Sequence, residues 1–139
     1  MGTVSRTVAT LRFFGDDLLP DEITSRLGRA PSESETKGDE RIRPNGTIRI
    51  ANRGSWRLSA ADREPGNLDA QIAELLSELS DDLTVWADLT TRFRADVFCG
   101  LFLEVGNEGI SLAPQTLALI ASRNLTLDLD IYSGRYDEN

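Results

Sequence analysis

Apolar positions along the chain follow two different periods, which predicts a mixture of strands and helices. Residues 4–14 combine β-branched, threonine and aromatic side chains and end at a glycine, which predicts a first strand. Leu19, Ile23 and Leu27 then recur at helical spacing, which predicts a short helix over residues 18–27. Gly28 is expected to end this helix.

The strongest helical pattern follows Asn67, where apolar residues form one continuous stripe: Leu68, Ile72, Leu75, Leu76, Leu79 and Leu83. Residues 95–105 form a nearly unbroken apolar run typical of a central strand. Residues 112–122 predict another helix, with Leu117, Ile120 and Ala121 facing inward. Strict alternation over residues 125–132 predicts a closing strand with one buried face.

The middle of the chain is predicted to hold a hairpin. Residues 29–40 are polar and loop-like, and residues 55–59 alternate as a short strand. Between them, residues 40–50 contain Pro-Asn-Gly flanked by isoleucines, which favours a type I turn followed by a left-handed glycine in a three-residue loop. A two-residue Asn-Gly loop is rejected, because it would mix Ile and Arg on both faces of the ribbon.

This order of elements predicts an α+β fold: a mainly antiparallel sheet with helices packed on one face, in a ferredoxin-like arrangement or as pseudo-duplicated β-α-β halves. The length of 139 residues fits a single domain over 1–139. Within it we expect a hairpin insertion at about residues 36–52 and a frayed tail at residues 135–139.

A short motif supports the pseudo-duplication, since it occurs twice, each time between a predicted strand and a predicted helix. The two copies are Gly15-x-Asp17-Leu18-x-Pro20 and Gly109-x-Ser111-Leu112-x-Pro114. Proline suits a first helical turn, because its missing N–H costs no internal bond there. Asp17 and Ser111 are the residues predicted to cap the two helices.

Several segments together resemble one bacterial family. They are Ala9 to Asp17 with Pro20, the Lys37-Gly38-Asp39 step, Gly54-x-Trp56-x-Leu58, Phe98 to Phe102 and Leu129 to Tyr132. In order and spacing they are similar to the family catalogued as domain of unknown function 4279, over nearly the whole chain. The resemblance implies a small bacterial protein of one domain, and it implies no catalytic or binding role for any residue.

Composition excludes several kinds of chemistry. The chain has no histidine and one cysteine, so Ser-His-Asp, Cys-His, histidine-ligated metal and disulfide chemistry are all excluded. Cys99 lies in an apolar run and is expected to be an inert core thiol. Gly-rich phosphate motifs are absent, and no cofactor is expected. No apolar run is long enough to span a bilayer, so a cytoplasmic protein without membrane contact is expected.

The net charge of −8 hides two regions of opposite sign. Residues 26–57 carry eight basic and four acidic side chains, whereas residues 62–139 carry five basic and 15 acidic ones. The predicted hairpin register places Arg41, Arg43 and Arg49 on one face and its isoleucines on the other, toward the protein. Three guanidiniums so close repel one another unless a phosphate, an acidic partner or the protein's own carboxylates lie nearby.

These features favour a non-catalytic binding or interaction module, regulatory or immunity-like in kind. Its predicted binding residues are Arg41, Arg43, Arg49 and Trp56, and its partner an acidic protein or a small anion, since Arg suits both. Trp56 is a candidate stacking platform, although a position beside Leu58 is typical of a core residue. The acidic net charge disfavours nucleic acid. The sequence does not predict the oligomeric state.

The alternative function is a histidine-free carboxylate enzyme or a divalent-metal binder. Asp128 and Asp130 lie two residues apart on one face of the last predicted strand, and Glu104 lies near the predicted centre of the sheet. Paired carboxylates can hold a metal or divide acid and base roles between them. A solvated polar face of an alternating strand explains the same pattern.

Overall fold

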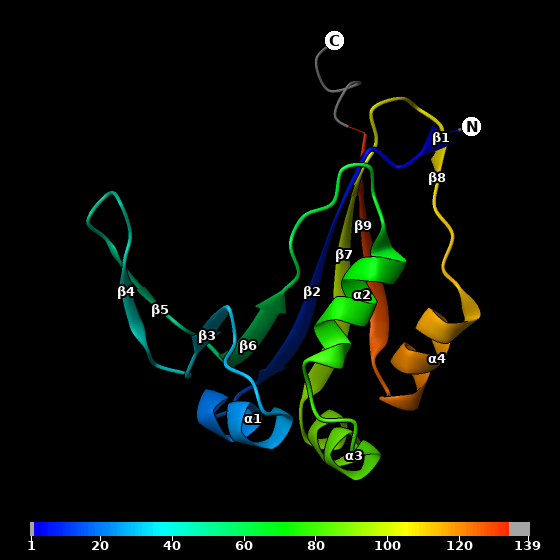
Figure 1. The fold of residues 1–139 in the computed structure, drawn as a ribbon. Coiled ribbons are helices and arrows are strands. Elements are labelled where there is room, and N and C mark those ends of the chain that lie inside the picture. The colour runs from blue at the N-terminus through cyan, green and yellow to red at the C-terminus, as the bar shows by residue number, and fades with distance from the viewer. Residues whose placement is uncertain (1, 134–139) are drawn as a thin grey trace.

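The computed structural model describes residues 2–133 and builds them around a five-stranded sheet (Figure 1). The order across the sheet is β3 (Glu33–Glu35), β6 (Gly54–Ser59), β2 (Arg6–Gly15), β7 (Arg94–Phe102) and β9 (Thr126–Tyr132). The helices are α1 (Pro20–Leu27), α2 (Leu68–Ser77), α3 (Leu83–Arg92) and α4 (Pro114–Ser122). The α+β class and the mainly antiparallel sheet are therefore confirmed.

Strand directions show how the two halves are joined. β2 is antiparallel to both β6 and β7, whereas β7 and β9 are parallel. The unit β2–α1–β6 thus connects antiparallel neighbours, and β7–α4–β9 connects parallel ones. Of these two units, β7–α4–β9 alone has the parallel strands of a β-α-β unit, so the expected pseudo-duplication does not extend to strand direction.

One face of the sheet is covered by the helices and forms the core. Along β2, the alternate residues from Thr7 to Phe13 are buried. The ring of Phe13 lies 5.9 Å from that of Trp56 on β6 and 6.1 Å from that of Trp86 on α3. Because each tryptophan N–H also has an acceptor, Thr24 Oγ1 and the Ser80 carbonyl, both indoles are buried without an unsatisfied donor.

The predicted helix caps are wrong. α1 and α4 begin at the prolines of the repeated motif, with Leu19 and Ala113 at the N-cap positions and no side-chain cap from either. Asp69 of α2 supplies the missing acceptor for α4, because its Oδ1 accepts from the Ala113 N–H at 3.0 Å and the Thr116 hydroxyl at 2.5 Å. A residue far away in the sequence therefore replaces the local cap.

The predicted long helix is two helices, because the chain turns after Ser77 and starts again at Leu83. Asp82 caps the second helix by accepting from the Thr84 hydroxyl at 2.6 Å and the Thr84 N–H at 3.0 Å, and these hydrogen bonds, that of the hydroxyl first, lower the pKa of Asp82. Three smaller predictions are also wrong. β3 occupies part of the predicted loop, Leu117 and Ala121 are exposed rather than inward, and the predicted buried face of the last strand is exposed at Leu129 and Ile131.

The hairpin has the predicted register but not the predicted environment. β4 (Glu40–Ile42) and β5 (Ile48–Ile50) pair Arg41 with Arg49, and Gly46 in the loop has a φ of 87°. The ribbon projects away from the sheet (Figure 1), and its isoleucines face solvent, with Ile42 79% exposed. The expected burial of the isoleucine side is therefore wrong.

Two short strands, β1 (Gly2–Thr3) and β8 (Glu108–Gly109), form a separate parallel pair near the N-terminus. The tail predicted to be frayed, residues 135–139, lies outside the described residues. None of the helices described in residues 2–133 has both the length and the apolarity needed to cross a membrane.

Candidate functional site

The face of the sheet opposite the helices carries arginines stacked on aromatic rings. Arg12 on β2 donates two hydrogen bonds of 2.8 Å to Asp96 on β7, and its guanidinium lies 4.3 Å from the Phe98 ring centroid. Asp96 is only 2% exposed, so this pair is the buried ionic contact of the open face. The hydrogen bond to Asp96 raises the pKa of Arg12.

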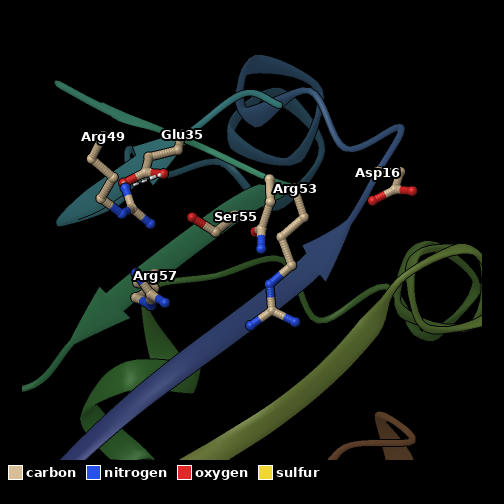
Figure 2. Close-up of a pocket in the computed structure, with 7 residues that line it drawn as sticks. Asp16, Glu35, Arg49, Arg53, Ser55 and Arg57 are labelled. Carbon is tan, nitrogen blue, oxygen red and sulfur yellow. Dashed lines mark hydrogen bonds and ion pairs between the residues drawn. The ribbon is translucent and has the colours of Figure 1, made fainter. Parts of the chain in front are cut away.

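A pocket of about 510 Å³ opens at the end of this face where β6 meets the base of the hairpin (Figure 2). Its lining is almost entirely polar: Asp16, Glu35, Arg49, Asn52, Arg53, Ser55 and Arg57. The strand β6 supplies Ser55 and Arg57, and Gly54 lets that strand start close to the segment before α1, because a Cβ there would lie 2.5 Å from the Leu18 carbonyl oxygen. We call this the arginine pocket.

The aromatic ring of Phe14 positions the arginines beside the pocket. Phe14 follows Phe13 on β2, so its side chain points to the open face, where it pairs in register with Ser55. The guanidiniums of Arg53 and Arg57 lie 4.1 and 5.3 Å from its ring centroid. A cation over an aromatic face is attracted by the ring quadrupole, which holds these two arginines without a carboxylate.

The two acids of the arginine pocket are already paired. Glu35 accepts from Arg49 at 2.7 Å, the contact drawn in Figure 2, and is also 3.2 Å from Arg41. Asp16 lies 3.5 Å from Lys37. Within residues 2–133, Arg53 and Arg57 form no ion pair, although Glu33 is the cross-strand neighbour of Arg57. The pocket therefore has uncompensated positive charge.

The predicted binding residues are placed differently from one another. Arg49 lines the arginine pocket, and Arg41 reaches the same carboxylate of Glu35. Of the anions expected near the hairpin, the protein's own Glu35 thus serves two of the three arginines. Arg43 lies near the exposed tip of the hairpin. Trp56 is 0% exposed on the covered face, so its ring offers no surface for stacking.

The predicted metal ligands are not gathered into one site. Asp128 lies 3.4 Å from Arg12, Asp130 accepts a hydrogen bond from Tyr132, and Glu104 accepts one from Ser5. The hydrogen bond to Asp130 raises the pKa of Tyr132. Residues 2–133 hold no cluster of three or more side chains able to bind a metal ion. These acids serve separate local contacts.

Cys99 is fully buried on the covered face of β7. Burial raises the pKa of its thiol to about 12, with nearby Asp96 and Asp128 acting in the same direction. A thiol with so high a pKa is protonated at neutral pH and is a poor nucleophile.

Phe14, Arg53 and Arg57 are among the site residues that the sequence did not predict. A signal for Phe14 was present, since two consecutive phenylalanines in a strand must point to opposite faces. The two arginines belong to the basic region, but nothing local shows that they meet Phe14 from a neighbouring strand.

The model of the family described as Domain of unknown function (DUF4279) matches residues 5–134. No curated protein matches the chain, and neither does any solved structure. With nearly its whole length matched, the chain belongs to the DUF4279 family.

Proposed function

We propose that this protein is a non-catalytic binding module whose arginine pocket holds carboxylates from an acidic segment of a partner protein. The observation that carries the proposal is the pair Arg53 and Arg57, stacked on Phe14 and left without an anionic partner among residues 2–133. Guanidiniums already fixed in place lose little side-chain entropy when a carboxylate arrives, and they can hold it with two parallel hydrogen bonds.

The extent of the basic surface favours a chain over a single small anion. Positive charge continues from Arg57 and Arg53 to Arg49 and Arg41, and then along the hairpin to Arg43. Two carboxylates lie within this surface, and both are paired: Glu35 with Arg49 and Arg41, and Asp16 with Lys37. A row of arginines along an exposed ribbon can contact several carboxylates of one extended segment, which raises affinity beyond that of one contact.

The remaining surface is consistent with selectivity for such a partner. The rest of the protein is strongly acidic, with 15 acids and five bases in residues 62–139. It would repel an acidic partner everywhere except at the basic region. Such charge asymmetry orients an encounter and disfavours wrong contacts.

A labelled oligo-glutamate peptide tests the proposal by fluorescence anisotropy. The wild-type protein should bind it, and binding should weaken as salt rises, because exposed charges are screened. Replacing both Arg53→Glu and Arg57→Glu should weaken binding by about tenfold or more, since charge-assisted hydrogen bonds are lost and repulsion is added.

The matched control is Arg6→Glu. Arg6 lies on the same strand and face as Phe14, stacks 4.3 Å from the Phe102 ring centroid, and is already paired with Asp62 at 2.7 Å. Its replacement should leave peptide binding unchanged. An equal loss in this control, or no binding by the wild type, would overturn the proposal. If the protein binds inorganic phosphate but not the peptide, the ligand of the arginine pocket is a small anion and not an acidic segment.

A further inference from the structure

A second pocket, of about 520 Å³, lies on the helical side of the molecule, away from the arginine pocket. It is formed by the second half of α2, the turn into α3 and the end of α4. Three leucines give it an apolar wall, and small or polar residues complete the lining: Leu76, Leu79, Leu119, Ala73, Ser77, Ser80, Asp81 and Arg123. We call it the leucine pocket.

Arg123 is the unusual residue of the leucine pocket. It follows α4 directly and is only 7% exposed, with its guanidinium 5.6 Å from the ring centroid of buried Trp86. Its Nη1 donates to the Leu119 carbonyl at 3.2 Å and lies 3.5 Å from the Ser122 hydroxyl. These contacts explain its position at the end of the helix, where a cation faces free carbonyls.

The contacts of Arg123 with Leu119 and Ser122 do not compensate the positive charge of its guanidinium. The Nε of Arg123 is buried and has no hydrogen-bond partner among residues 2–133, and no carboxylate there pairs with the guanidinium. A buried cation without a counter-ion is costly, and a buried N–H without an acceptor adds to that cost. Asp81, the acidic residue of the lining, is exposed and forms no ion pair with Arg123.

We propose that the leucine pocket binds an amphipathic monocarboxylate, with the carboxylate on Arg123 and the hydrocarbon chain along the leucines. One guanidinium balances one negative charge, whereas a dianionic phosphate would leave an excess beside Asp81. The mostly apolar wall with one fixed polar group is typical of sites for small molecules. This site does not depend on the proposed function, because its residues and its ligand class are different.

Calorimetric titration with decanoate tests the proposal, with 1-decanol as the uncharged ligand of equal chain length. The wild-type protein should bind decanoate, and bind decanol about tenfold or more weakly, because decanol lacks the charge-assisted contact. Equal affinities for decanoate and decanol would show that Arg123 does not bind the carboxylate. No binding of decanoate would overturn the site itself.

Two variants locate the bound ligand. Arg123→Gln should weaken decanoate binding by about tenfold or more and leave decanol binding unchanged. Because Arg123 also packs on Trp86, Ala73→Trp provides a second variant that fills the pocket from an exposed helical position. Its matched control is Ala87→Trp, the same change at an exposed position of α3 outside the lining.

Decanoate binding should be lost in Ala73→Trp and kept in Ala87→Trp, with thermal melts showing both folded. If Ala73→Trp still binds decanoate, or if both variants lose binding, the ligand does not occupy the leucine pocket and the proposal is wrong. The double replacement of Arg53 and Arg57 by Glu should not change decanoate binding, and Arg123→Gln should not change oligo-glutamate binding. Failure of either proposal is thus distinguishable from failure of the other.

Discussion

The two faces of the five-stranded sheet are made of different interactions. The helix-covered face is apolar, with Phe13 packed between Trp56 and Trp86. The open face holds arginines over aromatic rings, with one buried ion pair between Arg12 and Asp96. Burial of apolar area dominates folding energetics, whereas exposed ionic contacts contribute little to stability. The covered face should therefore determine stability, while the open face carries the arginine pocket of the proposed function.

The largest effect is expected at the centre of the covered face. Phe13→Ala should lower the free energy of unfolding by about 3–5 kcal/mol, because it leaves a cavity between two tryptophans. Urea denaturation measures this loss. Phe98→Ala on the open face should cost less than half as much, because Phe98 is only partly buried. Equal losses would mean that both faces act as core.

The second effect is expected at the buried ion pair of the open face. Arg12→Met should cost about 3 kcal/mol, because Asp96 remains buried without its counter-ion. Adding Asp96→Leu to Arg12→Met should restore most of that stability in the same urea experiment, since the charge is then gone. If the double variant is no more stable than the single one, ion pairing is not what Arg12 contributes.

A smaller effect is expected where α2 caps α4. Asp69→Ala should cost about 1–2 kcal/mol, because the N–H of Ala113 and the hydroxyl of Thr116 lose their acceptor. Ser111→Ala and Asp17→Ala are the controls and should change the thermal midpoint little. A larger shift of the thermal midpoint in Ser111→Ala than in Asp69→Ala would show that Ser111, and not Asp69, caps α4.

Acid should weaken the ionic contact between α1 and α3. Hydrogen bonds from Arg92, of 2.7 and 2.8 Å, lower the pKa of Glu22 below its ordinary 4.5. A lowered folded-state pKa contributes stability that is present above pH 4.5 and lost as the pH falls through the folded value. The thermal midpoint is measured at neutral pH and at a pH below about 4. It should fall less between these two conditions in Glu22→Gln than in the wild type. An equal drop would contradict this contribution.

The smallest effect is expected in the hairpin. Ile42→Thr should change the free energy of unfolding by no more than about 0.5 kcal/mol, because its side chain faces solvent. Ile23→Thr in α1, where the isoleucine is fully buried, is the matched comparison and should be strongly destabilising. A large loss from Ile42→Thr would show that the hairpin packs on something in the isolated protein.

The sequence predicted what depends on neighbouring residues and failed where distant residues decide. The hairpin register was predictable from the turn chemistry of Pro44, Asn45 and Gly46 and from alternation along its arms. Whether anything covers Ile42 depends on where the hairpin projects, which no local pattern contains. Ser111 was wrong as a cap for the same reason, since Asp69 takes the role for α4 from another helix. Asp17 was wrong as well, because α1 begins without a side-chain cap.

The residues of the candidate site also fall into those that the sequence predicted and those that it did not. Arg49 was predictable as a binding residue because the hairpin pattern places it on the arginine face. Arg53 and Arg57 gain their place from the ring of Phe14, which the pairing of β2 with β6 brings beside them. That pairing joins segments about forty residues apart, so the basic composition could be predicted from the sequence but not the pocket.

An NMR titration that follows the arginine Nε–H signals as oligo-glutamate is added tests directly whether the arginine pocket binds carboxylates. The signals of Arg49, Arg53 and Arg57 should shift, while those of Arg6 and Arg12 should stay in place. Shifts at Arg6 and Arg12 as large as those at Arg53 and Arg57 would contradict the proposal, because binding would then follow arginine as such and not the arginine pocket.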